Sequence, residues 1–117
     1  MTGSHEDLHR RMACNLSALD AGQRSRRAEL AALVRANTTR TVECPNGYEL
    51  HLRRNDEVLH LAEELVVLEK KCCSFLALGL RRDETTGDTV LTVSGSRGAK
   101  EFIAAELGVV DVDGDRA

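Results

Sequence analysis

The stretch NDEVLHLAEELVVLEKKCC, residues 55–73, has the most regular pattern in the chain and decides its fold. Apolar side chains recur in it at intervals of three and four residues, namely Val58, Leu61, Ala62, Leu65, Leu68 and Cys72. This spacing is typical of an amphipathic helix. Asn55 or Asp56 is suited to cap its start, because short polar side chains accept hydrogen bonds from free backbone N–H groups. The stretch therefore predicts a long helix with one buried face.

One β-hairpin is predicted before this helix and another after it. Residues 39–44 are rich in β-branched side chains, and residues 48–53 alternate between apolar and polar ones. The second hairpin is predicted from residues 75–82 and 89–94, which the polar segment 83–88 connects. The two hairpins together supply four strands.

The turn of the first hairpin, residues 45–47, decides which of its side chains face the core, because a shift of one residue reverses every side chain. A two-residue Asn-Gly turn would place Leu50 opposite Glu43. A three-residue loop with a left-handed glycine collects the apolar residues on one face, and we prefer it. The residues then predicted to face the core are Val42, Cys44, Tyr48, Leu50 and Leu52. Glu49 and His51 are predicted to point away, with His51 as a solvated surface histidine.

Two further helices complete the predicted fold. Asp20 and Gln23 have the spacing of a capping box and predict a helix that ends near Asn37. A last helix is predicted from Gly98 to Leu107. The resulting fold class is α+β, with a mainly antiparallel four-stranded sheet formed by two β-hairpins and packed with three helices. Apolar residues on both faces of the sheet's middle indicate that its second face meets the first helix or a second copy of the chain.

Length and composition favour a single domain. The chain has 117 residues, of which 42% are hydrophobic, so it can bury one core. Residues 1–13 are predicted to form a flexible N-terminal arm, and residues 14–110 are predicted to form the α+β domain. Residues 111–117 are predicted to be a flexible acidic tail.

Charge and hydropathy exclude several functions. A net charge of −3 gives no strong attraction for nucleic acid or an anionic membrane. No run approaches the roughly 18 apolar residues that a membrane span needs. Residues 1–11 are polar and lack the apolar segment of a signal peptide. We therefore expect a cytoplasmic protein with free thiols and with neither a nucleic acid nor a membrane as partner.

The four cysteines carry the main functional signal. Cys72 and Cys73 are adjacent at the end of the central helix, where the chain turns and two sulfurs can converge. Thiolates favour soft metal ions, and Cys14 is a candidate for a third ligand. Cys44 is expected mainly as a residue at the end of a hairpin strand, and it is a possible additional ligand. The alternative is that the adjacent cysteines are small core residues, because free cysteine is among the most buried residue types.

Two short motifs extend this signal, ACNL at residues 13–16 and EKKCCSFL at residues 69–76. In these motifs the chain resembles a group of small, largely uncharacterised bacterial proteins. They have an early Ala-Cys-x-Leu and a central Glu-x-x-Cys-Cys-x-Phe, and some are found beside mercury-resistance functions. Ser74 stands where the group usually has proline. The resemblance implies a thiol site made by Cys14, Cys72 and Cys73.

The sequence thus predicts cytosolic binding of a thiophilic metal ion such as mercury, arsenic, zinc or copper, for sequestration, delivery or sensing. The predicted metal ligands are Cys14, Cys72 and Cys73. A thiol enzyme or redox protein with Cys73 as nucleophile is one alternative, although neither a histidine base nor a C-x-x-C partner is identified. A structural or ligand-binding homodimer, with the cysteines only in the core, is another.

Overall fold

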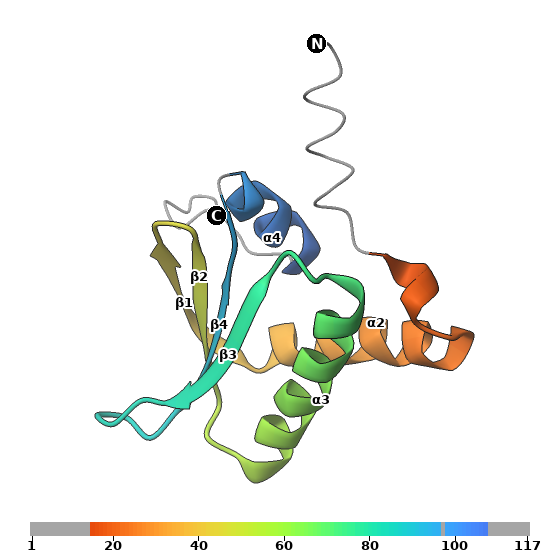
Figure 1. Cartoon of the computed structure of the whole chain (residues 1–117). Coiled ribbons are helices and arrows are strands. Elements are labelled where there is room, and N and C mark those ends of the chain that lie inside the picture. Colours follow the sequence, from red (N-terminus) through yellow and green to blue (C-terminus); the bar gives the residue numbers. More distant parts are fainter. Residues whose placement is uncertain (1–14, 97, 108–117) are drawn as a thin grey trace.

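The computed structural model describes residues 15–96 and 98–107 of the chain (Figure 1). Its helices are the short 3-10 helix η1 (Leu16–Ala18), α2 (Ala21–Ala36), α3 (Asp56–Cys72) and α4 (Ala99–Leu107). Its strands are β1 (Thr38–Cys44), β2 (Gly47–Leu52), β3 (Ala77–Arg82) and β4 (Thr89–Ser94). The α+β order of helix, hairpin, helix, hairpin and helix is the one that the sequence predicts.

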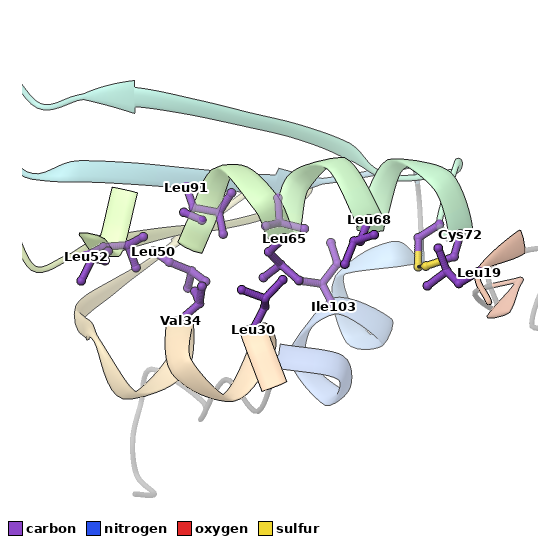
Figure 2. Close-up of a cluster of buried hydrophobic side chains, with 14 of the residues drawn as sticks. Leu19, Leu30, Val34, Leu50, Leu52, Leu65, Leu68, Cys72, Leu91 and Ile103 are labelled. Carbon is purple, nitrogen blue, oxygen red and sulfur yellow. Dashed lines mark hydrogen bonds between the residues drawn. The ribbon is translucent and has the colours of Figure 1, made fainter. Parts of the chain in front are cut away.

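The four strands form one antiparallel sheet in the order β1-β2-β4-β3. The second strand of each hairpin therefore lies in the middle of the sheet, where Leu50 pairs with Leu91. The first strand of each hairpin lies at an edge. All three α-helices pack on one face of the sheet, and the other face carries no helix of the described residues (Figures 1 and 2).

The helices begin where the capping signals place them. The side chain of Asp20 accepts the backbone N–H of Gln23, and the side chain of Gln23 accepts the backbone N–H of Asp20. The side-chain oxygen of Asn55 accepts the N–H groups of Glu57 and Val58. These bonds satisfy backbone donors that have no partner within the helix. The start of α3 is thereby fixed, and with it the side of the helix that its apolar residues occupy.

The core lies between the helices and the face of the sheet that they cover (Figure 2). Leu65 of α3, which is 2% exposed, lies in its middle. The side chains that surround it come from α2, α4 and the central strands, and include Leu30, Val34, Leu50, Leu52, Leu91 and Ile103. Because α2 packs on the same face of the sheet as α3, it is not the element that covers the second face.

The register of the first hairpin differs from the prediction. Val42 pairs with Glu49, Cys44 pairs with Gly47 and Leu50 pairs with Thr41, so the loop is Pro45-Asn46 and neither of the two predicted turns forms. Paired residues in an antiparallel sheet share a face, and alternate residues of a strand point to opposite faces. Val42 and Cys44 therefore lie on the face opposite to Leu50, and the prediction that they face the core is wrong. The prediction is confirmed for Tyr48, Leu50 and Leu52.

Gly47 provides the physical reason for this difference. It is an extended residue of β2, and the described glycines with a positive φ are Gly87 and Gly98. A Cβ atom at position 47 would lie 2.0 Å from the carbonyl oxygen of Val93 and 2.6 Å from the Cα of Ser94. The glycine is needed for the close approach of β2 to β4, and not for a left-handed turn.

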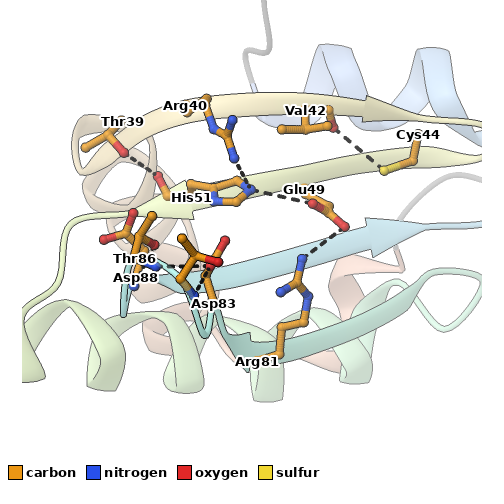
Figure 3. A network of polar contacts seen from close by, with 11 residues as sticks. Thr39, Arg40, Val42, Cys44, Glu49, His51, Arg81, Asp83, Thr86 and Asp88 are labelled. Atoms are coloured by element: carbon orange, nitrogen blue, oxygen red, sulfur yellow. Dashed lines mark hydrogen bonds and ion pairs between the residues drawn. The ribbon is translucent and has the colours of Figure 1, made fainter.

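His51 points away from the helices, as predicted, but it is 3% exposed and is not a solvated surface histidine. Its Nε2 lies 3.4 Å from Nη2 of Arg40 and 3.5 Å from Oε1 of Glu49 (Figure 3). The other carboxylate oxygen of Glu49 lies 3.3 Å from Nη2 of Arg81. The second face of the sheet thus carries a network of charged side chains around a buried imidazole.

The predicted arm of residues 1–13 and the predicted tail of residues 111–117 lie outside the described residues. Within the described part of the chain, no helix has the length and apolar character that a membrane crossing requires.

Candidate metal centre at the end of helix α3

Cys72 and Cys73 lie at the point where α3 ends. Cys72 is the last residue of the helix, and Cys73 is its C-cap with non-helical backbone angles, φ −122° and ψ 64°. This change of direction places the two sulfurs 3.6 Å apart, which confirms that they converge. The residues are 3% and 0% exposed. The end of α3 therefore holds two sulfur atoms inside the protein.

Glu69 extends this pair to a cluster of three potential ligands. It lies three residues before Cys72 on the buried side of α3, and it is 6% exposed. One carboxylate oxygen and the sulfurs of Cys72 and Cys73 all lie within 4.8 Å of one another. Sulfur and carboxylate ligands occur together in metal sites. The sequence analysis quotes Glu69 in a motif without assigning it a role. Its position four residues after Leu65, on the apolar side of the helix, is the signal that identifies it.

Arg27 of α2 neutralises the buried carboxylate of Glu69. Its Nε lies 2.9 Å from Oε2 of Glu69, and the two side chains are 14% and 8% exposed. A carboxylate at this depth without a cation would carry a large desolvation penalty. The pair thus allows an acidic residue to remain beside the cysteines, and it connects α2 to α3.

Burial raises the pKa of the Cys72 thiol. Arg27 opposes the rise in pKa because a nearby cation favours the thiolate, whereas the carboxylate of Glu69 adds to it. Lys70 and Lys71 precede Cys72 in the sequence but are exposed. Cys72 is therefore a protonated thiol at neutral pH, and it must lose its proton to bind a metal ion as a thiolate.

The cysteines differ in oxidation state. Cys73 takes part in a disulfide, whereas Cys44 and Cys72 are free thiols. The expectation of free thiols is confirmed for these two and is wrong for Cys73. A sulfur in a disulfide cannot act as a thiolate ligand. Metal binding by the cluster therefore requires the reduced form of Cys73.

Cys14, the third predicted ligand, lies outside the described residues. The next residue, Asn15, is described, and its backbone N–H donates to the carbonyl oxygen of Cys72 at 2.6 Å. The following helix, η1, packs against α3, and Leu19 belongs to the same buried cluster as Cys72 (Figure 2). The chain at residue 15 is therefore held against the end of α3 that carries the cysteines.

Cys44 lies apart from this cluster. It ends the edge strand β1 on the face of the sheet that the helices leave open, and its thiol contacts the carbonyl oxygen of Val42 at 3.8 Å (Figure 3). Cys72 and Cys73 lie on the helical side. The structure does not bring Cys44 together with the cysteines of α3.

Comparisons with known proteins give no indication of the role of this site, so the interpretation rests on its geometry. No protein-family model matches the chain, and neither a curated protein nor a solved structure matches it.

Proposed function

We propose that this protein binds a thiophilic metal ion at the end of α3, through Cys72 and Cys73 in their reduced form. The observation that carries the proposal is the buried cluster of two sulfurs and the carboxylate of Glu69, all within 4.8 Å of one another. Soft ions prefer sulfur ligands to oxygen or water, and a buried pair of thiolates excludes competing water. Mercury, trivalent arsenic, copper and zinc are the ions that such a site suits.

The charges of the cluster support this proposal. Two thiolates neutralise a divalent ion, and the pair of Arg27 and Glu69 is already neutral. A bound divalent ion would therefore leave no net charge in the buried site. This matters because an uncompensated buried charge is strongly unfavourable.

We further infer that Cys14 contributes a third sulfur. Consecutive Cα atoms are about 3.8 Å apart, so the hydrogen bond from Asn15 to Cys72 limits how far residue 14 can lie from the cluster. Cys44 and Cys72 are free, which leaves Cys14 as the cysteine of this chain that can pair with Cys73. Three thiolates would hold a soft trivalent ion such as arsenic more firmly than two, and they would leave the buried site without net charge. In the oxidised protein Cys14 and Cys73 would form the disulfide, and Cys72 would stay a free thiol.

The biological role that we propose is sequestration, delivery or sensing of the ion in the cytoplasm, where thiols stay reduced. The resemblance of the two cysteine motifs to bacterial proteins found beside mercury-resistance functions supports Hg(II) as the first ion to test. The metal ion is the partner in this proposal.

The test is a titration of the phosphine-reduced, chelator-free protein with Hg(II) in competition with a small thiol. The double change Cys72→Ala and Cys73→Ala should abolish tight binding, and Cys14→Ala should weaken it. Cys44→Ala is the matched control, since its thiol lies on the other side of the sheet, and it should leave the affinity unchanged. Equal affinity in the wild type and the double variant would remove the metal proposal.

A thiol redox function is the second candidate, because a free thiol lies beside the disulfide. The sulfur of Cys72 is 3.6 Å from that of Cys73. In a thiol–disulfide exchange, the Cys72 thiolate would attack Cys73, forming one S–S bond while the original one breaks and its other sulfur leaves as a thiolate. Cys72→Ser would then slow reduction of the protein by a dithiol. No change in that rate, measured by quenched-flow thiol labelling, would rule out this role.

A further inference from the structure

The exposed side of α3 has one large apolar side chain between charges of opposite sign. Val67 is 60% exposed, and it is the exposed large hydrophobic residue of the part of the chain that the structure describes. Glu63 and Glu64 lie about one helical turn before it, and Lys70 and Lys71 lie about one turn after it. All four charged side chains are exposed. Along this side, α3 is therefore acidic, then apolar, then basic.

These five residues share one side of the helix. With about 3.6 residues per turn, each charged residue lies within about 60° of Val67 around the helix axis. Glu63 and Lys70 occupy one flank of this side, and Glu64 and Lys71 occupy the other flank. The buried residues of α3, with the thiol cluster at its end, lie on the opposite side. No other helix or strand lies in front of α3 in Figure 1. The charged side of α3 is thus free to meet another molecule.

The order of the charges makes this side complementary to itself when two helices run antiparallel. A rise of about 1.5 Å per residue places Glu63 about 6 Å before Val67 and Lys70 about 4.5 Å after it. With a two-fold axis at Val67, Glu63 of one copy lies beside Lys70 of the second copy. Glu64 lies beside Lys71 in the same way, and the two Val67 side chains meet between these pairs. A parallel arrangement would instead place like charges opposite each other, which is unfavourable.

Interactions within one copy leave these charges available. The helix dipole does not explain the acidic pair, because Glu63 and Glu64 are the eighth and ninth residues of α3 and lie beyond its first turn. The two lysines have no acidic partner among residues 15–96 and 98–107. Glu64 already pairs with Arg26, whereas Glu63 contacts the exposed His60, which is charged only if protonated. The pair of Glu63 with a lysine of a second copy is therefore the better one to test.

We propose that the exposed side of α3 binds a second copy of this chain, forming an antiparallel, two-fold symmetric homodimer centred on Val67. The inference is independent of the metal proposal, since each thiol cluster stays within the core of its own copy. One side of one helix is a small interface, so the dimer is weak, with a dissociation constant on the order of 100 µM. At low micromolar concentrations the chain is then a monomer with Val67 exposed.

Glu63 and Lys70 allow a test by exchange of charge. Glu63→Lys turns both attractive contacts of the dimer into like-charge contacts, and Lys70→Glu does the same. Mixed in equal amounts, the two variants form a heterodimer in which both contacts are attractive again. Glu84→Lys is the matched control, because it makes the same change of charge as Glu63→Lys on the exposed turn between β3 and β4. Sedimentation equilibrium of the full chain, reduced with a phosphine and free of metal, measures the dissociation constants.

We expect each of the two variants to dimerise about tenfold more weakly than the wild type, because two ion pairs become two repulsive contacts. The mixture should associate about as tightly as the wild type. Glu84→Lys should differ from the wild type by less than about twofold. All three changes are at exposed positions, and circular dichroism would verify that the variants fold.

A wild type that stays monomeric up to about 1 mM, well above the expected dissociation constant, would overturn the proposal. A dimer whose affinity neither charge change alters would show that the copies meet elsewhere, and it would overturn the assignment to α3. The same conclusion would follow if the mixture associated no more tightly than the separate variants. None of these results affects the proposed function, because no metal takes part in the measurement.

Discussion

Arg27 and Glu69 form an ion pair, with 2.9 Å between Nε and Oε2, that joins α2 to α3 one helical turn before the cysteine pair. A pair this deep adds little stability compared with apolar residues of the same volume. Removing only one partner is nevertheless costly, because the other charge then stays buried without its counter-charge. The pair is therefore better explained as part of the site than as a stabilising device.

Arg27→Met should lower the free energy of unfolding by about 3–5 kcal/mol, because it leaves the carboxylate of Glu69 buried without its cation. The double variant Arg27→Met with Glu69→Met should recover most of this loss. Arg26→Met is the control, since Arg26 pairs with the exposed Glu29 and Glu64 and its removal should cost far less than that of Arg27. Urea unfolding measures all four proteins. A double variant no more stable than Arg27→Met would contradict the interpretation.

Leu65→Ala should destabilise the protein by about 2–5 kcal/mol, the usual effect of emptying a buried leucine site. Leu65 is 2% exposed and faces the centre of the core. Val67→Ala removes apolar atoms from the exposed side of the same helix and should change stability by less than about 0.5 kcal/mol. A loss below about 1 kcal/mol for Leu65→Ala in denaturant unfolding would show that this side of α3 is not core.

Gly47→Ala should destabilise the protein by at least about 1–3 kcal/mol, because the new methyl group meets the backbone of β4 at 2.0 Å and the strand must shift. Gly22→Ala is the matched control. A Cβ atom there has its nearest neighbour at 3.4 Å, and the change should stabilise the start of α2 by about 0.4–1 kcal/mol. Thermal unfolding distinguishes the two. A neutral Gly47→Ala would mean that β2 and β4 are further apart.

The raised pKa of Cys72 should appear in the pH dependence of its alkylation by iodoacetamide. Only the thiolate reacts, so the rate at Cys72 should still be rising above pH 9.0, the ordinary pKa of the thiol. Peptide mapping of the unreduced protein reports this rate, with the same peptide in urea as reference. An inflection below pH 9.0 in the native protein would contradict the prediction.

The raised pKa of Cys72 also makes the stability of the folded protein depend on pH. A thiol pKa that is higher in the folded state means that the folded protein holds this proton more tightly than the unfolded chain does. Cys72 therefore contributes stability that is fully present below pH 9.0 and is lost as the pH rises through the higher folded value.

Local signals were sufficient for most of the fold. The capping box of Asp20 and Gln23 and the cap at Asn55 mark helix starts through hydrogen bonds that span three residues or fewer. Which side chains of the first hairpin face the core could not be predicted from such local signals. The role of Gly47 depends on Val93, a residue of a strand that is distant in the sequence. The burial of His51 likewise depends on how side chains of separate strands meet.

The candidate site was likewise predictable only where its signals lie close together in the sequence. The adjacency of Cys72 and Cys73 at a helix end is visible in the sequence, and the structure confirms that their sulfurs converge. The contribution of Arg27 is not visible, because it comes from the packing of α2 on α3. The disulfide at Cys73 is likewise not visible in the sequence, which favoured free thiols.

The pairing of β2 with β4 also bears on the time course of folding. Each hairpin closes over a short loop, but the ladder that pairs Leu50 with Leu91 must bring together two hairpins separated by the whole of α3. Distant strand pairing is slow, since the entropy of closing the loop is lost before the contacts form. In the unfolded chain, Cys72 and Cys73 lack the core that buries them in the folded protein. A newly made chain is therefore exposed to ions and oxidants during the interval before its sheet is complete.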